Sequence, residues 1–323
     1  MNGNAPEESP RAREAGLMWP DILRRAGLDP DGHRAEIVHH RTGGYERMVL
    51  RLRSERGGDL ALKLAWNAPK LLLHHGARTQ GAAAEAMAAR GGEYAVPPVI
   101  HSERDPLIVL MPWVPGWTAQ AELSRARTDA ERHLVFQRCC RWVMALAGTD
   151  MRQENLSDFA LVALRQAKIG LARTNPSKEA MNAVTALADA VETEVTPRLG
   201  SPVQQGWSHG DMNFGNLVFG EDGKTYGVDL APKETLPVEV DLSTLLVAFA
   251  VSGKDGAEAL RLWQWAASFL IGIGADPDML RIQSRLVLMQ FWFYFERGKG
   301  ATGPWRANRA LILQILTAET LGA

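Results

Sequence analysis

The sequence is poor in cysteine: it contains two, Cys139 and Cys140, which are neighbours in a segment with helical apolar spacing. A disulfide framework needs several spaced cysteines, and a zinc site built on thiolates needs its ligands at characteristic intervals. Neither pattern is present, so a disulfide-stapled scaffold and a cysteine-zinc protein are excluded. We expect both thiols to be buried.

The sequence also lacks a charge excess and a long apolar run. Lys and Arg number 36 against 37 for Asp and Glu, so no global electrostatic attraction to nucleic acid or to an anionic membrane is expected. The first ten residues lack the apolar core of a signal peptide, and no apolar run approaches the roughly 20 residues that span a bilayer. We therefore expect a cytoplasmic protein whose partner is a small molecule, and the sequence leaves the oligomeric state open.

The chain does contain a compact group of polar residues around a predicted hairpin. His209-Gly210-Asp211 is followed by Asn216, and two short apolar runs then flank the turn-forming residues 220–224. Asp211 and Asn216 lie before the hairpin, and Asp229 ends its second strand. Two carboxylates and an amide oxygen are hard ligands, suited to a base and to magnesium that bridges phosphates, so the group predicts phosphoryl transfer.

The spacing of these residues supports the same interpretation. Asn216 follows Asp211 by five positions, as in the catalytic loop of protein kinases, and Asp229 lies thirteen beyond Asn216. Gly210 stands where protein kinases have Arg. Taken singly, each residue is equally well explained as part of a turn or of a strand end; the set at this spacing favours chemistry.

His-Gly-Asp with Asn five positions on resembles the aminoglycoside phosphotransferase and choline kinase superfamily, the small-molecule branch of the kinase-like fold. Asp241-Leu242 is similar to that family's Asp-Leu at the head of a helix, where Asp241 is expected to cap. The resemblance implies an α+β, protein-kinase-like bilobal fold, with an antiparallel N-lobe sheet of about five strands plus a helix and a mainly helical C-lobe. It implies ATP and magnesium as cofactors, with Asp211 catalytic and Asn216 and Asp229 holding the metal.

The N-terminal third of the chain has the strand patterns that such an N-lobe requires. Strand formers, alternating in places, and turn residues predict strands at 36–40, 47–53, 60–66, 96–100 and 107–111, and an Ala-rich segment predicts a helix over 80–89. Residues 1–15 are polar and contain proline, so we expect them to be poorly ordered.

Four residues of this lobe are candidates for contact with phosphates. Gly43 and Gly44 connect the first two strands and offer bare N–H groups. Taken alone they favour an ordinary turn, and their place before Lys63 is what supports a contact with phosphates. Lys63 lies on the strand where a kinase-like fold keeps its phosphate-binding lysine, although strand lysines are often only solvated. Glu85, the one acid in the segment 71–92, is the candidate to hold Lys63 by an ion pair.

The segment Met111–Gly116 is similar to the linker of the same superfamily. By that resemblance the Pro112 carbonyl and the Val114 N–H would meet the adenine edge, and proline keeps the carbonyl that this role needs. A proline-stiffened connection between lobes is compatible with the same residues. We place the nucleotide-binding lobe at 1–112 and the helical lobe, with catalytic loop and acceptor pocket, at 113–323.

The helical lobe indicates little about the acceptor. Helical patterns cover 131–146, 159–172, 178–197, 242–252, 256–271, 277–297 and 305–320. Residues 241–323 contain seven acids and eight bases, which is not the carboxylate-rich surface that a polycationic aminoglycoside would need. Aromatic residues gather at 263–269 and 291–295; they favour helix core, with a cation cage as the alternative.

These observations favour an enzyme that moves the γ-phosphoryl group of ATP to a hydroxyl of a small molecule such as an amino alcohol, a sugar or an antibiotic-like compound. The alternative is a catalytically silent nucleotide-binding module of the same fold. The residues that phosphoryl transfer requires are all present, which gives the alternative little support.

Overall fold

The computed structural model describes the chain except residues 1–9, 43–45, 68–69, 105, 299–303 and 323. It divides into two compact units: Met1–Trp117 with Val218–Lys233, and Thr118–Leu217 with Glu234–Ala323. The second segment of the first unit is the hairpin that contains Asp229. The boundary proposed from the sequence, between residues 112 and 113, differs from this division because it assigned the hairpin to the C-terminal lobe.

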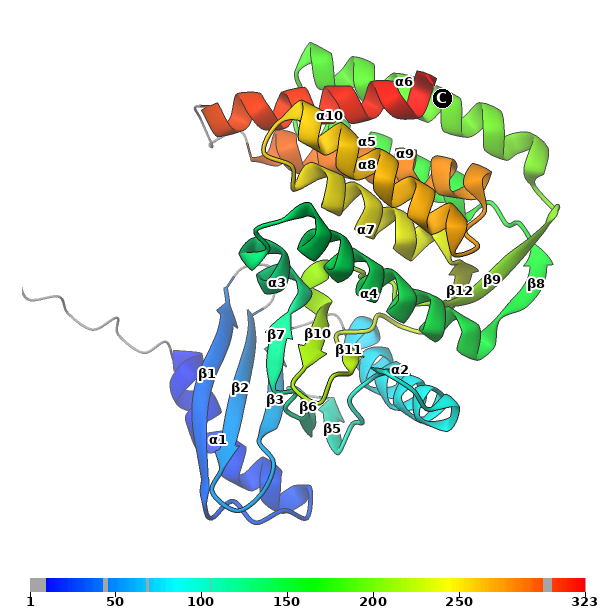
Figure 1. Cartoon of the computed structure of the whole chain (residues 1–323). Coiled ribbons are helices and arrows are strands. Elements are labelled where there is room, and N and C mark those ends of the chain that lie inside the picture. The colour runs from blue at the N-terminus through cyan, green and yellow to red at the C-terminus, as the bar shows by residue number, and fades with distance from the viewer. Residues whose placement is uncertain (1–9, 43–45, 68–69, 105, 299–303, 323) are drawn as a thin grey trace, which may run out of the picture. The chain divides into compact units, whose positions relative to one another are not determined.

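The first unit contains a five-stranded antiparallel sheet in the order β1-β2-β3-β6-β5 (Figure 1). Its strands are β1 (His33–Arg41), β2 (Glu46–Ser54), β3 (Leu60–Trp66), β6 (Leu107–Pro112) and β5 (His101–Arg104). Along β2 the side chains alternate, with Met48, Leu50 and Leu52 buried between half-buried or exposed neighbours. The expected α+β fold with a five-stranded N-lobe sheet is confirmed.

Both faces of this sheet are covered. One face packs Leu62, Leu64 and Leu110 against Ile22 and Leu23 of α1 (Pro10–Arg25). On the opposite face, Ala61 of β3 and Val109 and Met111 of β6 pack against Ala77 of α2 (Lys70–Arg90). Because successive strand side chains alternate in direction, an apolar run can supply two cores at once.

Two details of this unit differ from the sequence-based expectation. Residues 10–15, expected to be poorly ordered, begin α1, where Ala12 and Ala15 are buried and Arg11 lies 5.2 Å from the Trp66 ring centroid. The strand expected at 96–100 is instead irregular, and pairing begins near Ile100, whose N–H donates to the Leu110 carbonyl. Pro97 and Pro98 have no N–H to donate to a neighbouring strand.

A second sheet in the order β4-β11-β10-β7 contains the predicted hairpin. Its strands are β4 (Tyr94–Ala95), β11 (Thr225–Gly227), β10 (Leu217–Gly220) and β7 (Gly116–Thr118). Gly116 has a φ of 144° and lies so close to β10 that a Cβ would be 2.0 Å from the Phe219 carbonyl oxygen. This pairing explains why the hairpin belongs to the first unit.

The second unit is mainly helical. Its helices are α3 (Ala119–Arg125), α4 (Asp129–Ala147), α5 (Phe159–Ala172), α6 (Lys178–Val195), α7 (Glu239–Val251), α8 (Gly256–Gly272), α9 (Pro277–Arg297) and α10 (Pro304–Gly322). Short 3-10 helices are η1 (Gly148–Asp150), η2 (Thr196–Arg198) and η3 (Phe214–Asn216). The expected helices are present in this unit.

A three-stranded sheet in the second unit was not expected from the sequence. It runs in the order β12-β9-β8, with β12 (Glu234–Pro237), β9 (Pro202–Ser208) and β8 (Arg152–Asn155), all antiparallel. These segments are short and polar, so they give no strand periodicity. The sheet matters for the site because β9 ends at Ser208, directly before the His-Gly-Asp residues.

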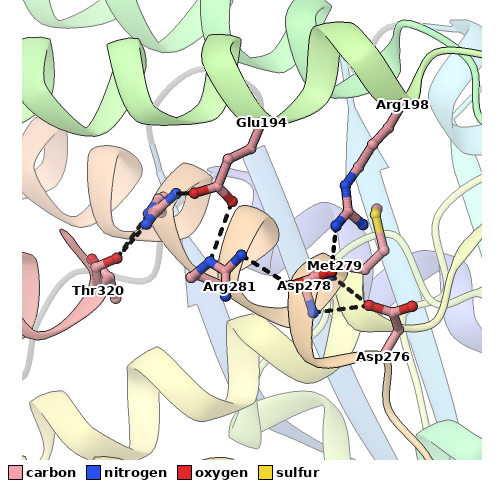
Figure 2. Close-up of polar contacts among 8 residues, drawn as sticks. Glu194, Arg198, Asp276, Asp278, Met279, Arg281 and Thr320 are labelled. Carbon is pink, nitrogen blue, oxygen red and sulfur yellow. Dashed lines mark hydrogen bonds and ion pairs between the residues drawn. The ribbon is translucent and has the colours of Figure 1, made fainter. Parts of the chain in front are cut away.

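Helix α9 is tied to its neighbours by charged side chains (Figure 2). Arg285, which is 3% exposed, donates to Glu194 of α6 and to the carbonyl oxygen of Thr320 in α10. Arg281, one turn earlier, also reaches Glu194 and pairs with Asp278. Helix α9 is thus linked to α6 and α10 by contacts that give the buried Arg285 guanidinium its hydrogen-bond partners.

Candidate active site

The catalytic loop, Ser208–Asn216, starts where β9 ends in the second unit. His209 is fully buried and packs edge-on against Trp142, with ring centroids 5.8 Å apart. Gly210 has a φ of 78°, a left-handed conformation that glycine adopts without a Cβ penalty. The chain therefore turns sharply after a buried anchor and presents Asp211, which is exposed.

Asp241 holds the beginning of this loop. Its Oδ2 accepts hydrogen bonds from the His209 N–H at 2.6 Å and from the Ser208 hydroxyl at 3.0 Å. Burial raises the pKa of Asp241, while neighbouring His209 and these hydrogen bonds act in the opposite direction. Asp241 lies inside the first turn of α7 and stabilises the loop, whereas the sequence suggested that it caps the helix.

The two candidate residues of the loop are joined by a hydrogen bond. The Asn216 Nδ2 donates to the Asp211 carbonyl oxygen at 2.7 Å, and the Asn213 Nδ2 donates to the same oxygen at 3.1 Å. The Asp211 N–H in turn donates to His209 Nδ1 at 3.3 Å. The loop thus orients the Asn216 amide with its nitrogen toward the backbone, which leaves the amide oxygen on the other side.

In the first unit, Lys63 forms an ion pair with Asp229. The two residues are 166 positions apart in the chain, and Lys63 comes from the middle of β3 while Asp229 follows β11. Asp229 has a φ of 63°, a left-handed conformation that Asp tolerates better than most side chains. A hydrogen bond of 2.9 Å from the Lys233 N–H to Thr79 ties the segment after Asp229 to α2.

The expected ion pair between Lys63 and Glu85 is not present among the described residues, and this expectation needs correction. Lys63 uses Asp229 as its partner, and Glu85 is exposed on α2. Lys63 lies on the sheet face that α2 covers, which made the helix a reasonable source of a carboxylate. The hairpin, however, brings Asp229 to the ammonium group.

The linker candidates lie in the first unit at the end of β6. Pro112 pairs with Leu60 of β3, and the N–H of Trp113 donates to the Asp59 carbonyl oxygen at 2.9 Å. Arg51 pairs with Asp59 and also stacks over the Trp113 ring, 4.9 Å from its centroid. These contacts hold the two residues that precede Val114. Gly43 and Gly44 lie outside the described residues.

The second unit contains a cavity of about 500 Å³ that the sequence did not reveal. It is lined by the beginning of α5 and by residues of β12, α7 and α9, among them Asp158, Glu234 and Gln283. Glu234 pairs across the sheet with Ser208, three residues before Asp211. Four segments distant in sequence form this cavity, so no local pattern could have predicted it.

The aromatic run at 291–295 is divided between different surroundings. Trp292 is fully buried and its indole N–H donates to Thr317. Phe293 and Phe295 lie under the guanidinium groups of Arg297 and Arg306, at 5.5 and 4.1 Å. Their ring faces are therefore occupied in part by cations of the protein itself.

A comparison with protein families matches residues 29–278, most of the chain, to the phosphotransferase enzyme family. The chain belongs to this family. The resemblance noted at the His-Gly-Asp loop is therefore confirmed, and small-molecule phosphoryl transfer is the activity that the family supports. No curated protein matches the sequence significantly.

Solved structures of phosphotransferases share the fold. A thermostable mutant of aminoglycoside phosphotransferase APH(4)-Ia, in ternary complex with AMP-PNP and hygromycin B, is 11% identical, with 94% of this chain and 98% of that chain covered and a TM-score of 0.60. Spectinomycin phosphotransferase APH(9)-Ia, in complex with ADP and spectinomycin, is 13% identical, with 95% of this chain and 97% of that chain covered and a TM-score of 0.56. A choline/ethanolamine kinase family protein from Mesorhizobium loti is 15% identical, with 96% of this chain and 97% of that chain covered and a TM-score of 0.59.

Among the residues that the structure describes, no helix is both long and apolar enough to cross a membrane. The same residues contain no cluster of three or more His, Cys, Asp or Glu side chains arranged to hold a metal. The candidate magnesium ligands of this phosphotransferase include an amide, Asn216, which such a cluster does not count.

Proposed function

We propose that this protein transfers the γ-phosphoryl group of ATP, with magnesium, to a hydroxyl group of a small molecule. The observation that carries the proposal is the hydrogen bond from Asn216 to the backbone of Asp211, because it fixes a carboxylate and an amide oxygen in one loop. Membership in the phosphotransferase family and the ATP analogue and ADP in related structures support the same chemistry.

Asp211 is the proposed catalytic residue. Its carboxylate is exposed, while its backbone is held by His209, Asn213 and Asn216. A carboxylate in this position accepts the proton of the acceptor hydroxyl as the oxygen attacks the γ-phosphorus, and it orients that hydroxyl beforehand. The rigid backbone fixes the direction of the carboxylate, which favours attack in line with the leaving ADP.

Asn216 and Asp229 are the proposed magnesium ligands. The donor set fits this metal, because an amide oxygen and a carboxylate are hard oxygen ligands and the Asn216 nitrogen is already used within the loop. When bound, magnesium would neutralise charge on the phosphates. Asp229 is held by Lys63, whose ammonium group in the same unit is suited to the α- and β-phosphates.

The remaining nucleotide contacts are proposed from the family resemblance. The Pro112 carbonyl and the Val114 N–H would meet the adenine edge. The contact of the Trp113 N–H with Asp59 supports this, because successive N–H groups of an extended chain point to opposite edges. Gly43 and Gly44 would approach the phosphates. Glu85 is not proposed as the partner of Lys63, since Asp229 has that contact.

The proposal is tested by measuring single-turnover phosphoryl transfer from γ-labelled ATP to a panel of amino alcohols, sugars and aminoglycosides. We expect Asp211→Asn to reduce transfer by about 100-fold or more while the affinity for magnesium-ATP changes little, because the side chain acts on the acceptor. Asp222→Asn is the matched control: it removes another exposed carboxylate, in the hairpin turn, and should leave transfer unchanged.

Two outcomes would contradict this assignment. Transfer by Asp211→Asn at the rate of the unmodified protein would remove the catalytic role of Asp211. Tight binding of magnesium-ATP without transfer to any acceptor of the panel would instead favour the catalytically silent nucleotide-binding module.

A further inference from the structure

The cavity of the second unit contains a buried amide without a partner. Gln283 of α9 lines the cavity, is 3% exposed, and its Nε2 has no hydrogen-bond partner among the described residues. A buried amide group that lacks a partner is costly, and a ligand oxygen or nitrogen in the cavity can supply that partner. Because the two ends of an amide have the same shape, Gln283 can present a donor or an acceptor to the ligand.

Apart from Gln283 and three neutral polar residues (Ser157, Thr244 and Gln290), the lining is apolar with charge of one sign. Apolar side chains come from all four elements, namely Phe159, Val162, Leu236, Val240, Leu286 and Val287. The charged members of the lining are Asp158 and Glu234, both exposed carboxylates. Such a surface attracts an amine, repels an anion, and offers too few carboxylates for a polycation.

The cavity is connected to the catalytic loop through the sheet of the second unit. Glu234 pairs with Ser208, and the Ser208 hydroxyl is bonded to Asp241, which also holds the His209 N–H. Glu234 of the lining therefore lies on the strand next to the origin of the loop that carries Asp211.

From these contacts we infer that the cavity binds the acceptor, and that the acceptor is an amphipathic amino alcohol with one amine, an apolar body and a polar atom that pairs with Gln283. This inference rests on the proposed function for the identity of the ligand as acceptor. Gln283 is a specificity-determining residue in this arrangement, because its amide forms a hydrogen bond with a polar atom on the body of the acceptor. Asp158 and Glu234 attract the amine of the acceptor.

The test measures binding of four probes to the full chain carrying Asp211→Asn, so that turnover is not needed. The probes are 1-amino-3-(hexyloxy)propan-2-ol, the same compound without its hexyloxy group, its carboxylate analogue 3-(hexyloxy)-2-hydroxypropanoate, and the polycation neomycin. We expect the first probe to bind at least about tenfold more tightly than the compound without the tail, because the tail is buried against apolar side chains. The carboxylate analogue and neomycin should bind more weakly than the first probe.

Two variants assign this binding to the cavity. Gln283→Leu keeps the size of the side chain and should weaken binding of the first probe about fivefold, the effect of one lost hydrogen bond. Ser284→Ala is the matched control, because Ser284 is its neighbour on α9 and is also buried with an unpartnered Oγ, yet it does not line the cavity. It should leave the affinity unchanged.

The outcomes separate this inference from the proposed function. Equal affinity with and without the tail, preference for the carboxylate analogue or neomycin, or equal effects of Gln283→Leu and Ser284→Ala would overturn the inference. The expected binding pattern, combined with no transfer from ATP to the first probe or to any acceptor of the panel by the protein with Asp211 intact, would support the ligand class of the cavity and contradict the proposed function. Transfer to another acceptor but not to the first probe would overturn the inference that the cavity binds the acceptor.

Discussion

Single residues set the local geometry around the candidate residues in each of the two units. Asp229 adopts a left-handed conformation two positions after the end of β11, and its carboxylate pairs with Lys63 from β3. Gly210 adopts a similar conformation in the catalytic loop, directly before Asp211. In each unit a residue at a sharp turn directs a carboxylate out of the backbone, which is a common way to place polar groups at functional sites.

Gly116 provides a test at this scale. A Cβ at this position would lie 2.0 Å from the Phe219 carbonyl oxygen, and the φ of 144° is unfavourable for any other residue. We expect Gly116→Ala to lower the free energy of unfolding by about 3 kcal/mol, because the backbones of β7 and β10 must separate. Chemical denaturation would measure the loss.

The control for this substitution is Gly223→Ala in the hairpin turn. Gly223 has a φ of 84° but open space around the position of a Cβ. It therefore reports the conformational penalty alone, for which we expect about 1–2 kcal/mol. Equal losses for the two variants would show that the close contact with Phe219 is unimportant.

At the scale of elements, α9 organises the second unit. It lines the cavity with Gln283 and, two positions further along the same helix, holds α6 and α10 through Arg285. Arg198 pairs with Asp278 near the start of α9, and that contact lowers the pKa of the Asp278 carboxyl. The position of the cavity wall thus depends on contacts that lie away from the cavity.

Substitution of Arg285 tests this arrangement. Arg285→Ala leaves the Thr320 carbonyl oxygen without its donor and removes a partner of Glu194, so we expect the free energy of unfolding to fall by about 3 kcal/mol. Arg281→Ala is the matched control, because it also contacts Glu194 but its side chain is 31% exposed. Its loss should be about 1 kcal/mol or less, and a larger loss for Arg281 would contradict the role assigned to burial.

At the scale of the whole molecule, the candidate nucleotide site draws on distant parts of the chain. The first unit is completed by the hairpin segment 218–233, which the chain contributes after passing through much of the second unit. Lys63 and Asp229 therefore meet only when this segment is in place. A ligand that binds to the folded state alone should stabilise this long-range arrangement.

Magnesium-ATP should accordingly raise the thermal unfolding temperature. At a concentration 100 times its dissociation constant the ligand adds about 2.7 kcal/mol, equivalent to several degrees for a chain of this size. Differential scanning calorimetry would measure the shift, and EDTA should reduce it because the metal contacts are lost. Lys63→Met should also reduce it; a full shift for this variant would contradict a phosphate contact of Lys63.

Much of this protein was predictable from local sequence. The catalytic loop, the hairpin and the strands β2, β3 and β6 follow from apolar alternation and turn residues, which act over a few positions. The helices of the second unit follow from apolar spacing and from caps such as Ser177. The family was indicated by the resemblance of the loop that contains Asp211 and Asn216 to a known superfamily, and the match over residues 29–278 agrees with it.

Only the tertiary structure determined which residues from distant parts of the chain contact one another. The sequence suggested Glu85 as the partner of Lys63, whereas the fold pairs Lys63 with Asp229. An ion pair depends on distance in space and not on distance along the chain. Asp229 is 166 positions from Lys63, so local sequence could not indicate this contact. The sheet of β8, β9 and β12 and the cavity around Gln283 were likewise invisible in the sequence. Periodicity describes the face of one element, but a cavity exists only where several elements fail to fill the space between them.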